Sequence, residues 1–124
     1  MAKRNGTKRA KPATALPANY NAFTDRFPEL VDAHERVAEA IERAGPLDLK
    51  TRELVRIGIA AAAGLETATK SHVRRALDAG ASVPEIEQTI LLLVNTCGFS
   101  RAAMGWQWAA RQIARGTGKP PSRD

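Results

Sequence analysis

The chain has 124 residues, the length of one domain, so a second independent fold is excluded. Hydrophobic residues make up 44% of the sequence and charged residues 26%, a globular mixture that excludes a wholly disordered chain. The formal net charge of +6 is compatible with a nucleic-acid partner, so the distribution of this charge along the chain is the next observation.

The excess positive charge is concentrated at the N-terminal end. Residues 1–20 hold five basic side chains and no acidic one, whereas residues 21–114 hold 11 basic and 12 acidic ones. Folded nucleic-acid-binding domains usually carry their basic surface on the fold itself. We therefore predict that residues 1–20 form a disordered basic tail. This tail makes weak, non-specific contacts with nucleic acid at most, and no specific nucleic-acid partner is expected.

Neither a membrane span nor a secretory signal is apparent. The longest uncharged apolar stretch, residues 57–65, is half of the roughly 20 residues that cross a bilayer. The basic tail lacks the apolar segment of about 7 to 15 residues that a secretory signal requires. The single cysteine, Cys97, supplies neither an internal disulfide nor a thiolate metal cluster, and it suits a reducing compartment. We expect a cytoplasmic protein with no structural metal site.

Residues 21–116 consist of segments rich in helix-forming residues, which are separated by Gly and Pro residues that end helices. They show no alternation of apolar and polar residues of the kind that indicates a strand. This predicts an all-α domain of about five to six helices. The first helix is expected to begin near Pro28 and to stop before Gly45. Its inward stripe is expected to comprise Leu30, Val31, Val37, Ala38 and Ile41.

Two further helices are expected to form a hairpin around Gly64. The first should be capped by Asp48, whose carboxylate can accept backbone N–H bonds, and should end at Gly64. The second should run from about Glu66 to Ala79 and close on Gly80.

Ser82 and Glu85 have the spacing of a capping box and open the fourth predicted helix. The apolar run of residues 90–94 leaves this helix no polar face, which predicts burial by neighbouring helices or by a second subunit. A last helix should begin near Ser100 and fade at Gly116, followed by a flexible end over residues 117–124. Its inward face is expected to comprise Ala102, Trp106, Ala109 and Ile113.

One pair of polar residues lies on otherwise apolar helix faces. Glu53 shares a line with Leu49 and Ile57, and His72 lies on a stripe of alanines. In a hairpin around Gly64 these two residues lie 11 positions before and eight after the turn, or about 16 Å and 12 Å along the helices. A carboxylate opposite an imidazole fixes its tautomer and favours its protonated form, so the spacing predicts an acid–base pair.

Structural alternatives exist for the same residues. Glu53 could form an ion pair with Arg56 or Arg75, and His72 could be a satisfied core residue. His34, among charged neighbours, is expected to be solvated. Cys97 is expected to be a small core residue and not a nucleophile. No glycine-rich phosphate loop, nucleophile elbow or zinc-protease helix is present, so no cofactor is expected.

Three segments carry a resemblance to a known family: LDLKTREL, HVRRALDAGASVPEIEQTILLL, and the CGF turn into a final Ala-rich helix. Together they resemble the carboxymuconolactone decarboxylase family, which includes the alkylhydroperoxidase AhpD-like proteins. The resemblance extends from Leu47 to Ile113. It implies an AhpD-like all-helical fold that assembles into homo-oligomers, either trimers or hexamers, with sites between helices and subunits.

The redox branch of that family is similar at Glu53 and His72 but carries Cys-x-x-Cys between them. Here the two cysteine positions are Leu65 and Ala68. Peroxide reduction needs one thiolate to attack and a second thiol to resolve the sulfenic acid. The resemblance therefore disfavours an alkylhydroperoxidase or peroxiredoxin-type activity, which ranks third.

The decarboxylase branch lacks the cysteine pair. It implies cofactor-free decarboxylation of a small carboxylated lactone, or of a related intermediate of aromatic degradation, with His72 as general acid–base and Glu53 orienting it. It further implies that Arg74 or Arg101 binds a substrate carboxylate. Thr96 and Cys97 lie in the segment where that branch has Tyr-Cys-Gly-Val-Pro, and we expect them at the substrate site. The alternative is a non-redox, divergent oligomeric scaffold or binding protein.

Overall fold

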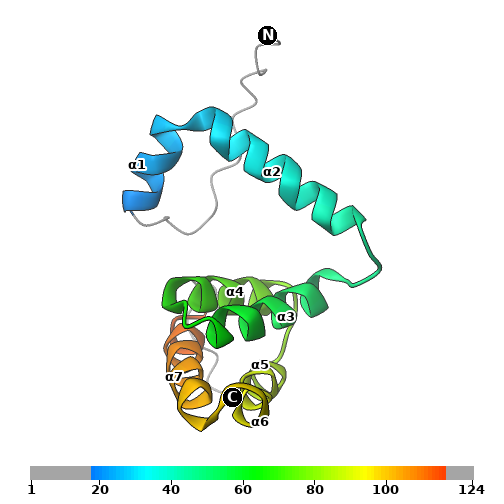
Figure 1. The fold of residues 1–124 in the computed structure, drawn as a ribbon, viewed down its shortest axis with the longest axis vertical. Helices are drawn as coiled ribbons and strands as arrows, with labels where there is room; N and C mark the ends of the chain where they lie inside the picture. The colour runs from blue at the N-terminus through cyan, green and yellow to red at the C-terminus, as the bar shows by residue number, and fades with distance from the viewer. Residues whose placement is uncertain (1–17, 117–124) are drawn as a thin grey trace. The chain divides into compact units, whose positions relative to one another are not determined.

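The computed structural model describes residues 18–116, and all regular elements in that range are helices (Figure 1). The all-α prediction is confirmed. Six helices have nine residues or more, and a seventh, α6, is a single turn of four residues. The helices are α1 (Ala18–Arg26), α2 (Pro28–Arg43), α3 (Leu49–Ala62), α4 (Glu66–Asp78), α5 (Val83–Leu91), α6 (Val94–Cys97) and α7 (Phe99–Arg115).

The described part of the chain divides into two compact units, the first ending at Gly45 and the second beginning at Pro46. The first contains α1 and α2, and the second contains α3 to α7. Helix α1 begins at Ala18, just before the predicted domain start at residue 21. The rest of the predicted basic tail, and the predicted flexible end over 117–124, lie outside the described residues.

In the first unit, α2 begins at Pro28 and ends before Gly45, as predicted. Helix α1 was not predicted; the rings of Phe23 and Phe27 pack with their centroids 5.1 Å apart where α1 meets α2. The prediction of a buried stripe on α2 is wrong for this structure. Its largest members are about half exposed, because α1 has only nine residues and cannot cover a helix of 16. These exposed members are Leu30, Val37 and Ile41.

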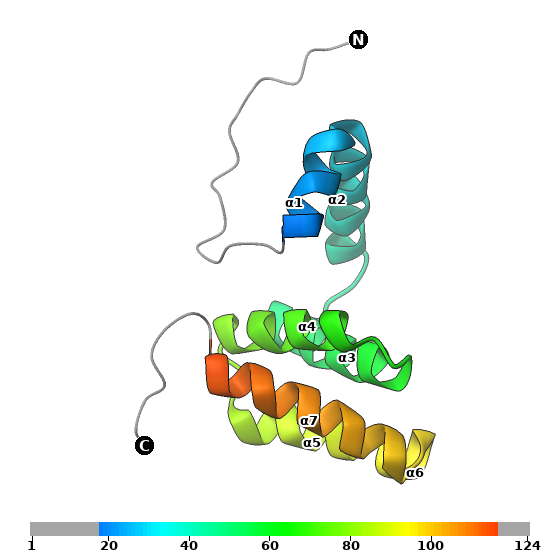
Figure 2. The same cartoon turned by 90° about the vertical axis from the view of Figure 1, so that its left-hand side faces the viewer.

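In the second unit, α3 and α4 form the predicted hairpin and lie side by side in both views (Figures 1 and 2). Asp48 caps α3, and its side chain accepts a hydrogen bond of 2.8 Å from the backbone N–H of Thr51. The turn after α3 passes through Gly64 at φ +75°. A residue with a side chain rarely adopts this left-handed conformation, which explains why glycine ends the helix here.

Helices α5 and α7 lie beside one another against the hairpin (Figure 2). The core between them and the hairpin includes Ile57, Val73, Ile86 and Ile90, all fully buried. Gly105 of α7 permits a close approach to α3. A Cβ built on this glycine would lie 3.1 Å from the Cβ of Ala61 and would crowd it.

The close approach at Gly105 corrects the predicted inward face of α7. Ala102 and Ala109 are buried as expected, but Trp108 is buried in place of Trp106, which is 48% exposed. Because Gly105 faces Ala61 of α3, Trp108, three residues later, lies on the same face of the helix, whereas Trp106, one residue later, does not.

The predicted capping box of α5 is confirmed. The hydroxyl of Ser82 accepts from the Glu85 N–H at 3.2 Å, and the Glu85 carboxylate accepts from the Ser82 N–H at 2.8 Å. In the apolar run that follows, Ile90 and Leu93 are buried whereas Leu91 and Leu92 are 59% and 62% exposed. Neighbouring helices therefore cover one side of this run only.

Candidate functional site

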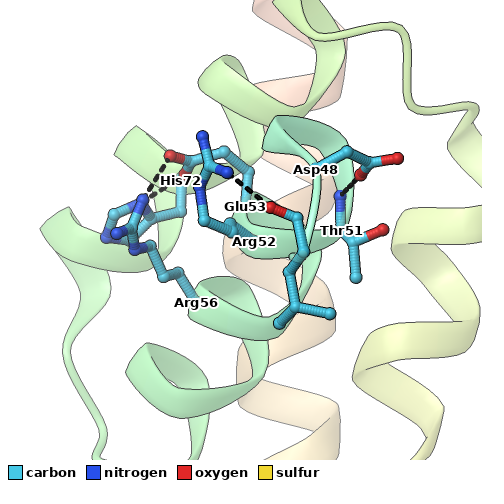
Figure 3. Close-up of polar contacts among 7 residues, drawn as sticks. Asp48, Thr51, Arg52, Glu53, Arg56 and His72 are labelled. Carbon is cyan, nitrogen blue, oxygen red and sulfur yellow. Dashed lines mark hydrogen bonds and ion pairs between the residues drawn. The ribbon is translucent and has the colours of Figure 1, made fainter. Parts of the chain in front are cut away.

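Glu53 on α3 and His72 on α4 meet across the hairpin. The His72 Nδ1 and Glu53 Oε2 atoms are 2.7 Å apart (Figure 3). The prediction that the two residues lie at similar heights on facing helices is thereby confirmed. Their chemical roles stay a prediction at this point.

Arg56 also contacts the carboxylate. Its Nη1 donates a hydrogen bond of 3.0 Å to Oε1 of Glu53, three residues earlier on the same helix. Glu53 therefore bridges the imidazole through one oxygen and the guanidinium through the other, and all three side chains meet in Figure 3. The ion pair considered as a structural alternative for Glu53 coexists with the histidine contact.

Burial distinguishes the three side chains. Glu53 is 3% exposed, whereas His72 is 21% exposed and Arg56 is 29% exposed. Burial disfavours the ionised carboxylate, but the hydrogen bonds and the charges of His72 and Arg56 outweigh that effect, so the pKa of Glu53 is below its ordinary value. The site thus contains a buried, ionised carboxylate beneath a partly accessible imidazole and a partly accessible guanidinium cation.

Several contacts hold the first turn of α3, which precedes Glu53. Asp48 caps this turn by accepting a hydrogen bond from the Thr51 N–H, and the hydrogen bonds with Thr51 hold the pKa of Asp48 below its ordinary value. A guanidinium N–H of Arg52 donates to the carbonyl of Leu47 (Figure 3). Lys50 forms an ion pair of 3.0 Å with Glu85 at the start of α5. These contacts fix the helix that carries the carboxylate.

The contact with Glu53 defines what His72 can do. An ionised carboxylate only accepts hydrogen bonds, so Nδ1 of the imidazole carries the hydrogen that points to it. The second ring nitrogen, Nε2, then accepts a proton when the ring is neutral and donates one when it is protonated. The arrangement suits transfer of a proton between Nε2 and a bound molecule.

The two arginines expected to bind substrate come from α7 and α4, and their role stays a prediction. The guanidinium of Arg101 packs over Gly64, at the position that a Cβ on this glycine would occupy. Gly64 precedes His72 by eight residues, about 12 Å along a helix. Arg74 is half-buried on α4, two residues after His72. Residues two apart on a helix do not share a face.

Thr96 and Cys97 belong to α6, the single turn that precedes α7. The Thr96 hydroxyl donates a hydrogen bond of 2.8 Å to the Leu92 carbonyl, so it is engaged within its own segment. Cys97 is exposed, which makes the prediction of a core position wrong. None of the four residues of α6 is buried, so the thiol lies on a segment that does not pack into the core. This segment ends in Gly98 at φ +107°, where the chain turns into α7.

The positions of the redox cysteine pair are occupied by Leu65, which is 53% exposed, and Ala68, which is half-buried. His34 is exposed, as predicted. Within the described part of the chain, no three His, Cys, Asp or Glu side chains are grouped so as to hold a metal ion. No helix in that same part has the length and apolar character needed to cross a membrane.

From the sequence, Arg56 was expected only as an alternative ion-pair partner of Glu53. That Arg56 and His72 contact the two oxygens of the same carboxylate was not predicted. The spacing of three residues between Glu53 and Arg56 was the available signal, because such residues are neighbours on a helix surface.

Comparison with known proteins identifies one family. A family model described as "Carboxymuconolactone decarboxylase family" matches residues 28–111, more than half of the chain. The match spans α2 to α6 and most of α7, and it includes Glu53, Arg56 and His72. No curated protein and no solved structure matched the chain.

Proposed function

The chain belongs to the carboxymuconolactone decarboxylase family, and on this basis we propose that it removes CO2 from a small carboxylated lactone, or a related intermediate of aromatic degradation, by acid–base catalysis. The contact of 2.7 Å between His72 and Glu53 carries the proposal. It gives His72 the role of general acid–base and Glu53 the role of positioning residue.

The reaction needs little from the protein besides binding and a proton. The bond between the lactone carbon and the leaving carboxylate breaks, CO2 departs, and the electron pair moves into the conjugated lactone. The lactone anion formed in this way then takes a proton from Nε2 of the protonated His72. The imidazole ring afterwards recovers a proton from solvent. Glu53 fixes the orientation of the ring throughout, through its contact of 2.7 Å with Nδ1. No external electron acceptor is required.

The residues between the pair favour this chemistry over peroxide reduction. Leu65 and Ala68 cannot form a thiolate or a sulfenic acid. Cys97 lies on α6, where it has no second cysteine in the sequence to resolve an oxidised form. A non-redox reaction at His72 is therefore the function that these residues support best.

We also propose that the protein acts as a cytoplasmic homo-oligomer. Leu91, Leu92 and Phe99 are 59%, 62% and 75% exposed in the single chain, and they flank α6 along the sequence. Exposed large apolar side chains that are grouped on a surface mark interaction sites. Light scattering on purified protein should show an oligomer for the wild type and a smaller species for Phe99→Glu. A monomeric wild type would contradict the assembly.

The direct test is CO2 release from γ-carboxymuconolactone by purified protein with no added cofactor. The wild type should turn over, and His72→Gln should lose at least about a hundredfold in kcat while keeping its circular dichroism and thermal transition. Absence of turnover by a folded wild type, or full activity of His72→Gln, would overturn the proposal. In the first case the divergent scaffold becomes the leading function.

A further inference from the structure

Glu53 brings a guanidinium and an imidazole to opposite oxygens of one carboxylate. Arg56 bonds Oε1 at 3.0 Å, and His72 bonds Oε2 at 2.7 Å. Two groups bonded to the same carboxylate lie close enough for a molecule of a few carbon atoms to contact both. Figure 3 shows the two side chains converging on Glu53 from different helices.

The Arg56 side chain retains capacity for a second anion. A guanidinium has five N–H hydrogens in a planar fork, and the contact with Glu53 is made through Nη1. The residue is 29% exposed, whereas the carboxylate beneath it is 3% exposed. Glu53 therefore anchors the guanidinium from the buried side, and the partly exposed side can form the bidentate contact that arginine makes with carboxylates.

The chemistry of the guanidinium favours an acid as the bound molecule. Arg56 is permanently charged, and its partly exposed N–H groups can form charge-assisted hydrogen bonds with a carboxylate, which are about twice as strong as hydrogen bonds with a neutral acceptor. A neutral ester of the same shape accepts only the weaker hydrogen bonds.

We propose that Arg56 binds the substrate carboxylate beside His72 and sets the preference of the site for acids. The inference rests on the proposed function and adds the residue that reads the substrate's charge. Arg101 packs at the Gly64 turn, and Arg74 lies on α4 two residues from His72, off its face. Arg56 takes the place that the sequence-based interpretation gave to one of these two arginines.

Binding without turnover tests this role. The probes are cis,cis-muconate, a small dicarboxylate, and its dimethyl ester, each titrated into full-length protein by calorimetry. We expect the wild type to bind muconate at least about tenfold more tightly than the diester, since a hydrogen bond to a charged group is worth about that factor or more. Arg56→Gln should bring the ratio of the two dissociation constants close to one.

Two further variants test whether the preference for the acid depends on the planar guanidinium of Arg56 or only on the presence of a positive charge. Arg56→Lys keeps the charge but not the planar fork, so it should retain part of the preference. Arg75→Gln removes an exposed arginine from α4 and should leave the preference at the wild-type value. The nitrogen-15 spectrum of the His72 ring should show that its contact with Glu53 persists in Arg56→Gln.

The outcomes discriminate between the two proposals. An unchanged preference for the acid in Arg56→Gln, an equal loss in Arg75→Gln, or no binding of muconate by the wild type would overturn the role of Arg56. If Arg56→Gln does not fold, Arg56→Lys decides, and an unchanged ratio in that variant contradicts the role. A wild type that prefers the acid but releases no CO2 contradicts the decarboxylation and leaves Arg56 as the carboxylate-binding residue.

Discussion

Nδ1 of His72 lies 2.7 Å from Oε2 of Glu53, although the two residues are 19 positions apart in the chain. The contact joins α3 to α4 on the inner side of their hairpin. Its carboxylate is 3% exposed and its imidazole 21% exposed, so one partner is held inside the protein and the other can reach a bound molecule. This asymmetry underlies both the chemistry proposed for the site and the contribution of the buried carboxylate to stability.

Removing the charge of Glu53 should weaken the fold. Glu53→Gln keeps the size of the side chain but replaces an ionised acceptor that serves His72 and Arg56. We expect a loss of about 1–3 kcal/mol in the free energy of unfolding at pH 7, because a hydrogen-bonded buried group loses its charge-assisted contacts. Urea denaturation measures this loss. A variant as stable as the wild type would show that the contacts contribute nothing.

The same carboxylate should make stability depend on pH. Because the folded pKa of Glu53 lies below its ordinary value of 4.5, the unfolded chain binds the proton more readily. The stabilisation from Glu53 is therefore present above about pH 4.5 and is lost as the pH falls through the folded pKa. The difference in unfolding free energy between wild type and Glu53→Gln should be constant above about pH 5 and should shrink as the pH falls below about 4.5.

Glu66 provides the matched control for that pH experiment. Its pKa is also below the ordinary value, because of its hydrogen bond to Lys70, but the side chain lies on the surface. Solvent screens such pairs, so Glu66→Gln should change the pH dependence much less than Glu53→Gln does. Equal effects of the two substitutions would contradict a special contribution from the buried carboxylate.

Two glycines with positive φ should respond similarly to alanine. Gly80 at φ +94° has open space around a built Cβ, so Gly80→Ala should cost only the backbone strain, about 1–2 kcal/mol. Gly64→Ala at φ +75° should cost about the same, because the Arg101 guanidinium that the new methyl group would meet is the far end of a flexible side chain and moves aside. Thermal unfolding of both variants, with Gly45→Ala as the unstrained control, measures the two costs. A much larger loss at Gly64 than at Gly80 would contradict this expectation.

The capping box of α5 should contribute measurably to stability. Ser82→Ala removes the acceptor for the Glu85 N–H and should destabilise the protein by about 1 kcal/mol. Ser82→Asp retains an acceptor and should lose much less. Chemical denaturation of both variants checks the expectation, and equal losses would point to a cause other than the cap.

Local sequence signals predicted the helix ends well. Pro28, Asp48, Ser82 and Gly64 act on the backbone within a few residues of themselves, so their effect can be read without knowledge of the tertiary structure. The meeting of Glu53 and His72 was also predictable, because a hairpin around a known turn fixes which residues face each other.

Features that depend on distant packing could not be read in the same way. Trp108 is buried instead of Trp106 because α7 approaches α3 at Gly105, a contact between segments more than 40 residues apart. The exposure of Leu30 on α2 and of Leu92 after α5 depends on which partner covers each helix. The position of Arg101 over Gly64 likewise follows from the docking of α7, not from its own sequence neighbourhood.

The most direct measurement is a double-mutant cycle on kcat for CO2 release from γ-carboxymuconolactone, with wild type, His72→Gln, Glu53→Gln and the double variant. If Glu53 acts only by positioning the His72 ring, the double variant should be no slower than His72→Gln alone, since nothing remains for the carboxylate to orient. Rate losses that multiply, so that removal of Glu53 slows the reaction equally with and without His72, would contradict a shared acid–base unit.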